Sequence, residues 1–185
     1  SILDAFAPYF EKGQIAYEAF VDGVAYGGRA YVEHPEAFGV PERNVAYVQS
    51  TRKPVDDILA FLSEHEEELD SLDIVAVNPV LYQEIEDQIP RITKAVYVTS
   101  AVSYRLEISH KDSGKAAGLA YVLDLLGIAP EETIAFGDGD NDAEMLAFAG
   151  LGVAMENATE KCKAAADAVC DRCENDGVAR FLYGF

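Results

Sequence analysis

Apolar positions in the C-terminal third of the chain alternate between two periods. The run TIAF at 133–136 is apolar without a break, which is typical of a strand buried on both faces. LGVAM at 151–155 and DAVC at 167–170 predict two more strands. The segment before TIAF has the helical period and ends at Gly127, and its apolar positions are Leu119, Val122, Leu123 and Leu126.

Further helices are predicted between and after these strands. A short helix covers 143–150, and a last one covers 176–185. Another helix opens at Asn157 with Glu160 three positions later, like a capping box with Asn as the cap. Strands that alternate with helices over short connections predict parallel βαβ units, in which the chemistry lies beyond the carboxyl ends of the strands.

The first hundred residues predict an α+β layer instead. Residues 14–28 alternate around Asp22-Gly23, which indicates a hairpin. Single strands are also predicted at 44–50 and 73–77, and two further strands at 94–109. Two helices are predicted: 54–69, with Pro54 in its first turn and a solvated acidic end, and 79–89.

The two patterns predict two domains within an α/β chain. Residues 1–108 would form the α+β domain, and residues 109–185 would form part of a Rossmann-like domain with a parallel sheet. The join is expected near Ile108 to Asp112, where the strand pattern gives way to a polar link that contains glycine.

Charge and composition limit the kinds of molecule that the chain is expected to bind. The 185 residues carry a net charge of −19, which repels phosphate backbones and argues against nucleic acid. An anionic substrate would need a metal ion or a well-placed lysine. No apolar run approaches the ~20 residues that span a bilayer, and no leader is recognised, so we expect a cytoplasmic protein without a membrane partner. The odd set of Cys162, Cys170 and Cys173 is interpreted as reduced thiols, with structural zinc as the alternative.

The stretch IAFGDGDNDAEML at 134–146 concentrates acidic residues directly after the predicted strand TIAF. A calcium loop counted from Asp138 fails, because Ala143 and Ala149 stand where Gly and Glu are needed. A dinucleotide turn fails because Asp142 replaces its third glycine. Mg²⁺ fits better, since it takes one or two carboxylates together with waters and substrate oxygens. The plainer alternative is that one residue of the turn only caps the next helix.

Lys115 opens the helix that precedes TIAF. A surface lysine alone means little. A lysine roughly twenty residues before a metal-type turn is typical of phosphate handling, where it supplies a point positive charge.

Two segments resemble the haloacid dehalogenase-like hydrolases of the Cof type: 107–169, from EISHKDSGK to KAAADAV, and 175–182, NDGVARFL. These hydrolases carry an α/β cap of the second class. The resemblance is close from about residue 105 onward, and the first hundred residues resemble the cap in outline. It implies a Mg²⁺-dependent phosphatase for small phosphomonoesters, such as sugar phosphates, that works through an aspartyl-phosphate.

Site roles follow from the same resemblance. Lys115 matches the lysine that neutralises phosphoryl oxygens, and Asn141 matches the asparagine that helps to bind the phosphate. Asp138 matches the metal-binding aspartate, and Asp142 matches the residue that binds or orients the metal shell. Asn157 receives no role, because it is interpreted as a helix cap.

The nucleophilic aspartate of the family, in a DxDGT-like stretch near the chain start, has no match. The D-x-D pattern occurs only within the acidic turn, and Phe6 stands where an acid would have to follow Asp4. We therefore interpret the chain, which begins at Ser1, as the back portion of a longer protein that lacks roughly eighty front residues. That missing segment, or another chain, would cover the edge of TIAF.

Two rival functions remain open: a non-catalytic binding or regulatory module, and a phosphotransferase like the phosphomannomutases. The substrate would be a small phosphorylated metabolite in either enzymatic case. No residue of the first domain is assigned to substrate selection, and three are interpreted as surface only: Arg52, Lys53 and Tyr82.

Overall fold

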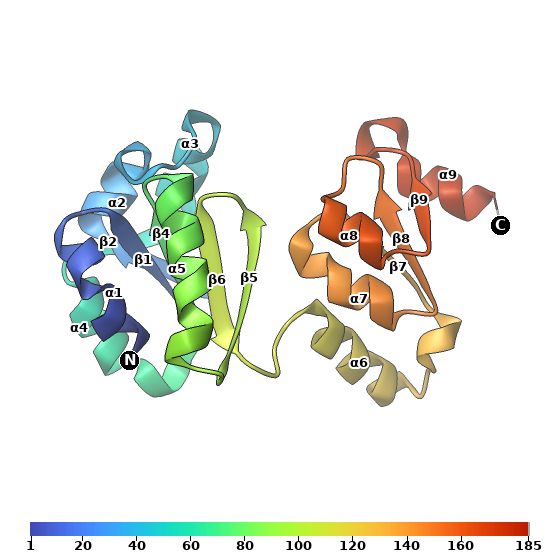
Figure 1. The fold of residues 1–185 in the computed structure, drawn as a ribbon, viewed down its shortest axis with the longest axis horizontal. Helices are drawn as coiled ribbons and strands as arrows, with labels where there is room; N and C mark the ends of the chain where they lie inside the picture. Colours follow the sequence, from blue (N-terminus) through green and yellow to red (C-terminus); the bar gives the residue numbers. More distant parts are fainter. Residues whose placement is uncertain (185) are drawn as a thin grey trace. The chain divides into compact units, whose positions relative to one another are not determined.

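The computed structural model describes residues 1–184, and every side chain among them except that of Ala101. The chain divides into two compact units, which we call unit 1 (Ser1–Lys111) and unit 2 (Asp112–Phe185) (Figure 1). Each unit is described by itself.

Unit 1 is built on one six-stranded sheet with the order β3-β2-β1-β4-β6-β5. Only the β2–β3 pair is parallel. The strands are β1 Ile15–Val21, β2 Val24–Gly28, β3 Arg52–Val55, β4 Leu69–Ala76, β5 Val96–Val102 and β6 Arg105–His110. The helices are α1 Ile2–Glu11, α2 Arg29–Glu33, α3 Glu42–Thr51, α4 Ile58–Glu64 and α5 Pro79–Ile92, with short 3-10 turns η1 Pro35–Phe38 and η2 Glu66–Glu68.

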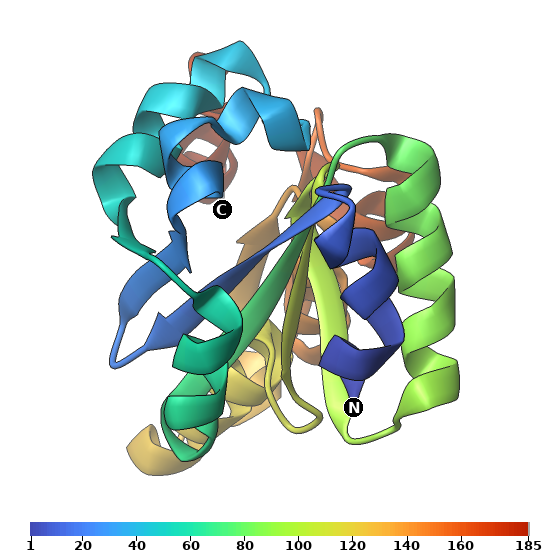
Figure 2. The same ribbon diagram turned by 90° about the vertical axis from the view of Figure 1, so that its left-hand side faces the viewer.

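Helices pack on both faces of this sheet. Alternate residues of the central strands, such as Tyr17 and Ile74, form one core with α1, α4 and α5. Helices α1 and α5 lie side by side (Figures 1 and 2), and the Tyr9 hydroxyl donates to Glu84 Oε1 at 2.6 Å between them. On the opposite face, a smaller core joins α2 and α3 to residues of β1 and β4. These two helices lie at the end of the unit away from the N-terminus (Figure 2).

The predicted hairpin around Asp22-Gly23 is confirmed. Asp22 and Gly23 both have positive φ, 50° and 71°, as the tight turn between β1 and β2 requires. Strands are also confirmed where the sequence predicted β4, β5 and β6, as is helix α5.

Two elements predicted for unit 1 are wrong. Residues 44–50 form part of helix α3, because Val48 is buried at helical spacing from the partly buried Val45 while Tyr47 is 59% exposed. Pro54 lies in β3 and does not open a helix; β3 is an edge strand, where proline is tolerated. The sequence analysis also did not predict α1.

Arg52 is not a surface residue, contrary to its interpretation from the sequence. It is 5% exposed and forms an ion pair with Glu18. Helix α4 begins after Asp57, whose carboxylate accepts hydrogen bonds from the N–H groups of Leu59 and Ala60.

Unit 2 is a parallel sheet of three strands in the order β7-β8-β9, as the sequence predicted. The strands are β7 Ile134–Gly137, β8 Leu151–Met155 and β9 Ala168–Cys170. The helices are α6 Lys115–Leu126, α7 Ala143–Phe148, α8 Glu160–Ala165 and α9 Gly177–Tyr183, with 3-10 turns η3 Pro130–Glu132, η4 Asp140–Asp142 and η5 Cys173–Asn175.

Helices cover both faces of this smaller sheet. On one face, Leu146 of α7 packs close to β8 because Gly152 has no side chain. On the other face, Phe181 of α9 makes an edge-to-face contact with Phe136 of β7. Within the part of unit 2 that the structure describes, β7 pairs with β8 alone, so its other edge carries no strand. Ile134 of β7 is 39% exposed there, contrary to the expectation that TIAF is buried on both faces.

The cap of α8 also differs from the prediction. Thr159, not Asn157, is the N-cap, and its hydroxyl accepts a hydrogen bond from the Cys162 N–H at 3.2 Å. Asn157 is exposed in the turn before it. Among the helices described here, none combines the length and the apolar character needed to cross a bilayer.

Candidate functional site

The acidic turn begins at the carboxyl end of β7 and leads through η4 into α7. Gly137 and Gly139 are needed here because a larger residue would collide with the side chains of the turn. A Cβ on Gly137 would lie 2.4 Å from Cβ of Asp142, and a Cβ on Gly139 would lie 2.7 Å from Oδ1 of Asn141. Neither glycine has a positive φ. The glycines therefore allow the side chains of η4 to fold back against the end of β7.

Asp142 lies at the centre of the turn and is only 3% exposed. Its Oδ2 accepts hydrogen bonds from the backbone N–H groups of Asp138 and Gly139, each at 2.9 Å. Its Oδ1 accepts a hydrogen bond from the ammonium of Lys115. One carboxylate thus ties the start of α6 to the end of β7.

This set of contacts favours the ionised form of Asp142. Burial works against ionisation, but the hydrogen bonds from Lys115 and from the N–H groups of Gly139 and Asp138 outweigh it and hold the pKa of Asp142 below its usual value. The turn therefore holds a fixed negative charge beside a fixed positive one at neutral pH.

Lys115 is placed by the residue before it. Gly114, the N-cap of α6, has φ 110°, which a residue with a side chain rarely adopts. The lysine is the first residue of the helix, and its side chain is 49% exposed. Its ammonium therefore contacts Asp142 while part of the side chain stays open to solvent.

The structure places all four predicted site residues close together in unit 2. Asp138 and Asn141 lie on the same turn as Asp142, and Asp142 contacts Lys115. Asp138 is exposed, and no partner for its carboxylate is found among residues 1–184. The turn therefore presents a free carboxylate next to an anchored ammonium.

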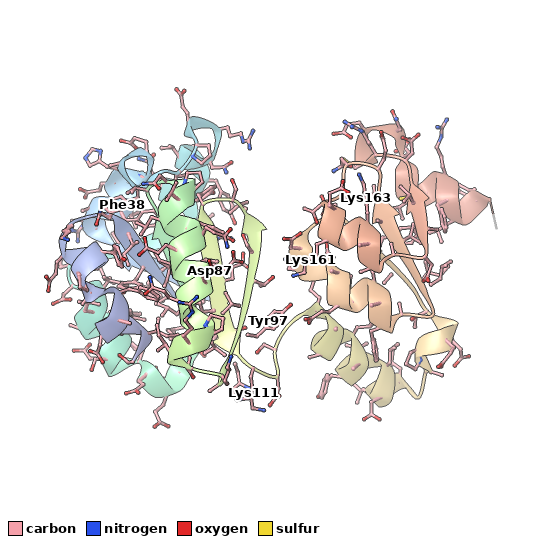
Figure 3. The ribbon with its side chains drawn as sticks, in the orientation of Figure 1. Phe38, Asp87, Tyr97, Lys111, Lys161 and Lys163 are labelled. Carbon is pink, nitrogen blue, oxygen red and sulfur yellow. The ribbon has the colours of Figure 1, made fainter. Side chains whose placement is uncertain are left out.

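Thr159, the N-cap of α8, contacts the acidic turn and was not predicted from the sequence as part of the site. Its hydroxyl donates to Asp140 Oδ1 at 2.5 Å, and its N–H donates to the carbonyl oxygen of Asp138 at 3.0 Å. The signal for it in the sequence is a threonine, a common N-cap residue, directly before Glu160. Thr159 links α8 to the acidic turn (Figure 3 shows Lys161 and Lys163 on this helix).

Among the described residues, no group of three or more His, Cys, Asp or Glu side chains is arranged to hold a metal ion. Cys162, Cys170 and Cys173 are free thiols, and burial together with the carboxylates of the acidic turn raises the pKa of Cys162. The acidic turn supplies one free carboxylate, which is enough only for a metal that takes its other ligands from water or substrate.

Asp4 does not resemble a nucleophile. It lies in the first turn of α1, not at the end of a strand, and its carboxylate accepts a hydrogen bond from the hydroxyl of Ser1. The Asp4 N–H in turn donates to the Ser1 hydroxyl, so Asp4 acts as part of a helix cap.

The sequence of this chain is similar to known hydrolases. Residues 6–182 match the family of haloacid dehalogenase-like hydrolases. The chain is 35% identical over 159 residues to a phosphoglycolate phosphatase of Methanopyrus kandleri, which covers 84% of this chain and 68% of that protein. It is 49% identical over 77 residues to the 5-amino-6-(5-phospho-D-ribitylamino)uracil phosphatase YitU of Bacillus subtilis, which covers 42% of this chain and 28% of that protein.

Solved structures share the fold. A haloacid dehalogenase-like hydrolase from Bacteroides thetaiotaomicron has a TM-score of 0.72 at 23% identity, over 98% of this chain and 65% of that one. The HAD subclass IIB sugar phosphatase BT4131 has a TM-score of 0.72 at 22% identity, over 100% of this chain and 65% of that one. The chain thus spans about two thirds of these structures. With a family match over residues 6–182, the chain belongs to the haloacid dehalogenase-like hydrolases.

Proposed function

We propose that this chain is the part of a Mg²⁺-dependent phosphatase that binds the metal and neutralises the phosphoryl group of a small phosphomonoester. The observation that carries the proposal is the hydrogen bond of Lys115 to Asp142 at the end of β7, beside the free carboxylate of Asp138. The 35% identity to a phosphoglycolate phosphatase supports the same activity. Phosphoglycolate and sugar phosphates are therefore the first substrates to test.

Lys115 would act as the cation for the phosphoryl oxygens. An ammonium has three donors, and Asp142 takes one of them. Because the side chain is 49% exposed, the remaining donors can reach a ligand. Asp142 would act as the positioning residue that keeps the ammonium beside the turn. Asn141 would offer its amide to the same phosphate from the same turn.

The residues of the turn fit part of a Mg²⁺ site. Mg²⁺ binds through one or two carboxylates together with waters and phosphate oxygens, and the exposed carboxylate of Asp138 is a suitable ligand. Both oxygens of Asp142 already accept hydrogen bonds, so it fits an orienting role better than direct ligation. When bound, Mg²⁺ would polarise a phosphoryl oxygen.

We further propose that the attacking carboxylate comes from outside the described residues. Asp4 belongs to a helix cap. In the acidic turn, the carboxylates of Asp140 and Asp142 already accept hydrogen bonds, and Asp138 is the proposed metal ligand. The open edge of β7 and the exposed apolar side chains of α6, among them Tyr121 and Leu125, would then be covered by the segment or chain that supplies it. Unit 1 would serve as the cap of the enzyme.

Phosphate release tests the proposal. We expect no Mg²⁺-dependent release of phosphate from phosphoglycolate or p-nitrophenyl phosphate by this chain alone, and clear release by the longest gene product that contains these residues. Robust turnover by the chain alone that Asp4→Asn abolishes would refute the external nucleophile. A longest gene product without any turnover would refute the enzymatic function.

One observation favours a non-catalytic module as the second candidate. The carboxylate of Asp142 is fully satisfied by Lys115 and two backbone N–H groups without a metal, so the turn is also a complete structural element. A module of this kind would keep its stability and binding properties in Mg²⁺-free buffer and would show no turnover in any gene product. A phosphotransferase would instead pass the phosphoryl group to a second sugar phosphate in the same assay.

A further inference from the structure

Three carboxylates form a row across neighbouring strands of unit 1. In the strand register, Glu18 of β1 lies opposite Asp73 of β4, and Asp73 lies opposite Glu107 of β6. Directly opposite residues share one face of a sheet, and like charges in such pairs are destabilising. We call these three residues the acid row. Glu18 and Asp73 are 0% and 1% exposed.

Two arginines contact the acid row. Arg52 binds Glu18 with two donors, Nε to Oε1 at 3.0 Å and Nη2 to Oε2 at 2.9 Å. Arg105 is shared among all three acids, with distances of 3.5 Å to Glu18, 3.3 Å to Asp73 and 3.0 Å to Glu107. Three carboxylates and two guanidinium groups leave one negative charge without a counter-charge.

The other neighbours do not supply that charge. The hydroxyl of Tyr31, from α2, donates to Glu18 Oε1 at 2.5 Å, and the ring of Tyr47, from α3, lies 5.1 Å from the guanidinium of Arg52. Tyr31 is neutral because burial raises the pKa of its hydroxyl, and Tyr47 contributes the face of its ring. The charged groups that act on Asp73 are Arg105, Glu18, Glu107 and Arg52.

Asp73 is the member of the row with the poorest contacts. Its Oδ1 is buried and has no hydrogen-bond partner among the described residues. Its Oδ2 lies 3.3 Å from Nε of Arg105, but that N–H is not aligned to donate to it. A buried carboxylate in such a position is costly when ionised, and the cost is relieved when the group takes up a proton.

We propose that the acid row binds one proton at neutral pH, held on Asp73, and that loss of this proton to alkaline solvent loosens β4 from β1 and β6. In the protonated state, Arg52 and Arg105 balance Glu18 and Glu107. After deprotonation, the Asp73 carboxylate faces a carboxylate on each side. Unit 1 thus carries a pH-sensitive element of its own.

The titration of Asp73 agrees with this arrangement. Burial raises its pKa to about 8; the charge of Arg105 opposes the rise, and Glu18 adds to it. Because the folded value exceeds the ordinary value of 3.8, the folded chain holds the proton where the unfolded chain has lost it. The associated stability is complete below the ordinary value, falls as the pH rises toward about 8, and is lost above that.

A titration of the wild-type chain tests the proton directly. The chain is labelled with ¹³C at aspartate carboxyls, and their chemical shifts are followed from about pH 5 to about pH 10. We expect one aspartate signal with a midpoint near 8, absent in Asp73→Asn. If every aspartate signal completes its change below about pH 6, the proposal is overturned.

Hydrogen exchange and urea unfolding test the structural consequence. Amides of β4 and β6 should lose protection between about pH 5 and about pH 8, after correction for the intrinsic rate, while α6 amides should not. The urea midpoint should fall over the same range and level off above it in wild type and in the turn variant Asp22→Asn, and stay level throughout in Asp73→Asn. An equal fall in Asp73→Asn contradicts the proposal. If Asp73→Asn does not fold, the wild-type titration still decides.

Discussion

The ammonium of Lys115 donates a hydrogen bond to the carboxylate of Asp142, 27 positions later in the chain. This contact joins the first residue of α6 to the turn after β7, so two segments that are separate in sequence form one site. The carboxylate is buried and the lysine is half-exposed. The pair therefore stabilises unit 2 and also presents a positive charge at its surface.

Lys115→Met should destabilise unit 2 by about 1–2 kcal/mol at neutral pH, because it leaves a buried carboxylate with two backbone donors only. The pKa of Asp142 is lowered, so the stability that the pair contributes is present above the ordinary value of 3.8 and is lost as the pH falls through the folded value. Urea unfolding at about pH 7 and about pH 2 measures both effects.

The matched control is Lys161→Met on α8, another exposed lysine of unit 2. It should change the free energy of unfolding by less than about 0.5 kcal/mol. Equal losses in both variants would show that the contact with Asp142 adds nothing to stability.

Gly137→Ala should destabilise unit 2 by about 2 kcal/mol or more, because the new Cβ would lie 2.4 Å from Cβ of Asp142. The control is Gly118→Ala in the middle of α6, where the added Cβ meets nothing within 4 Å. That change should stabilise the helix by about 0.5–1 kcal/mol. Thermal unfolding of the two variants checks the opposite signs, and a destabilised Gly118→Ala with an unaffected Gly137→Ala would contradict this account of the turn.

Arg52→Met should cost about 3–5 kcal/mol in unit 1, since it leaves Glu18 buried with fewer counter-charges. Lys53→Met, at the next position, should cost less than about 0.5 kcal/mol because Lys53 is exposed. Denaturant unfolding followed by a probe in unit 1 compares them. If both variants lose a similarly small free energy of unfolding, the buried ion pair of Arg52 with Glu18 does not stabilise unit 1.

Thr159→Val should cost about 1 kcal/mol, because it removes the cap of α8 and the hydrogen bond to Asp140. Thr159→Ser keeps the hydroxyl and should recover most of that stability. Chemical unfolding measures both variants. If Thr159→Ser is as unstable as Thr159→Val, the methyl group and not the hydroxyl carries the effect.

The sequence predicted unit 2 better than unit 1 for a physical reason. A parallel sheet with short connections gives continuous apolar strands and helices with clear ends, such as TIAF and the helix that ends at Gly127. In unit 1, the apolar residues of 44–50 fit a strand and a helix equally well over so few positions. Only the tertiary packing of Val48 against its core decides for the helix.

The same limit applies to single side chains. Lys115, Asp138 and Asp142 could be singled out because their residue types and spacing suit phosphate and Mg²⁺, whereas the role of Asn141 is implied only by the family resemblance. Arg52 could not be recognised as buried, because its partner lies 34 positions away on another strand. Acids that are far apart in sequence meet only through the strand register, so the acid row has no local signal.

The proposed phosphatase function requires Asp138 to hold Mg²⁺ beside Lys115. Phosphate release by the longest gene product, measured against Mg²⁺ concentration, tests it most directly in Asp138→Asn and Asp140→Asn. Asp140 is the matched control, because it lies on the same turn and its carboxylate accepts the hydroxyl of Thr159. We expect a loss of about 100-fold or more in kcat/KM for Asp138→Asn and less than about threefold for Asp140→Asn. Equal activity of Asp138→Asn and the wild type would contradict it.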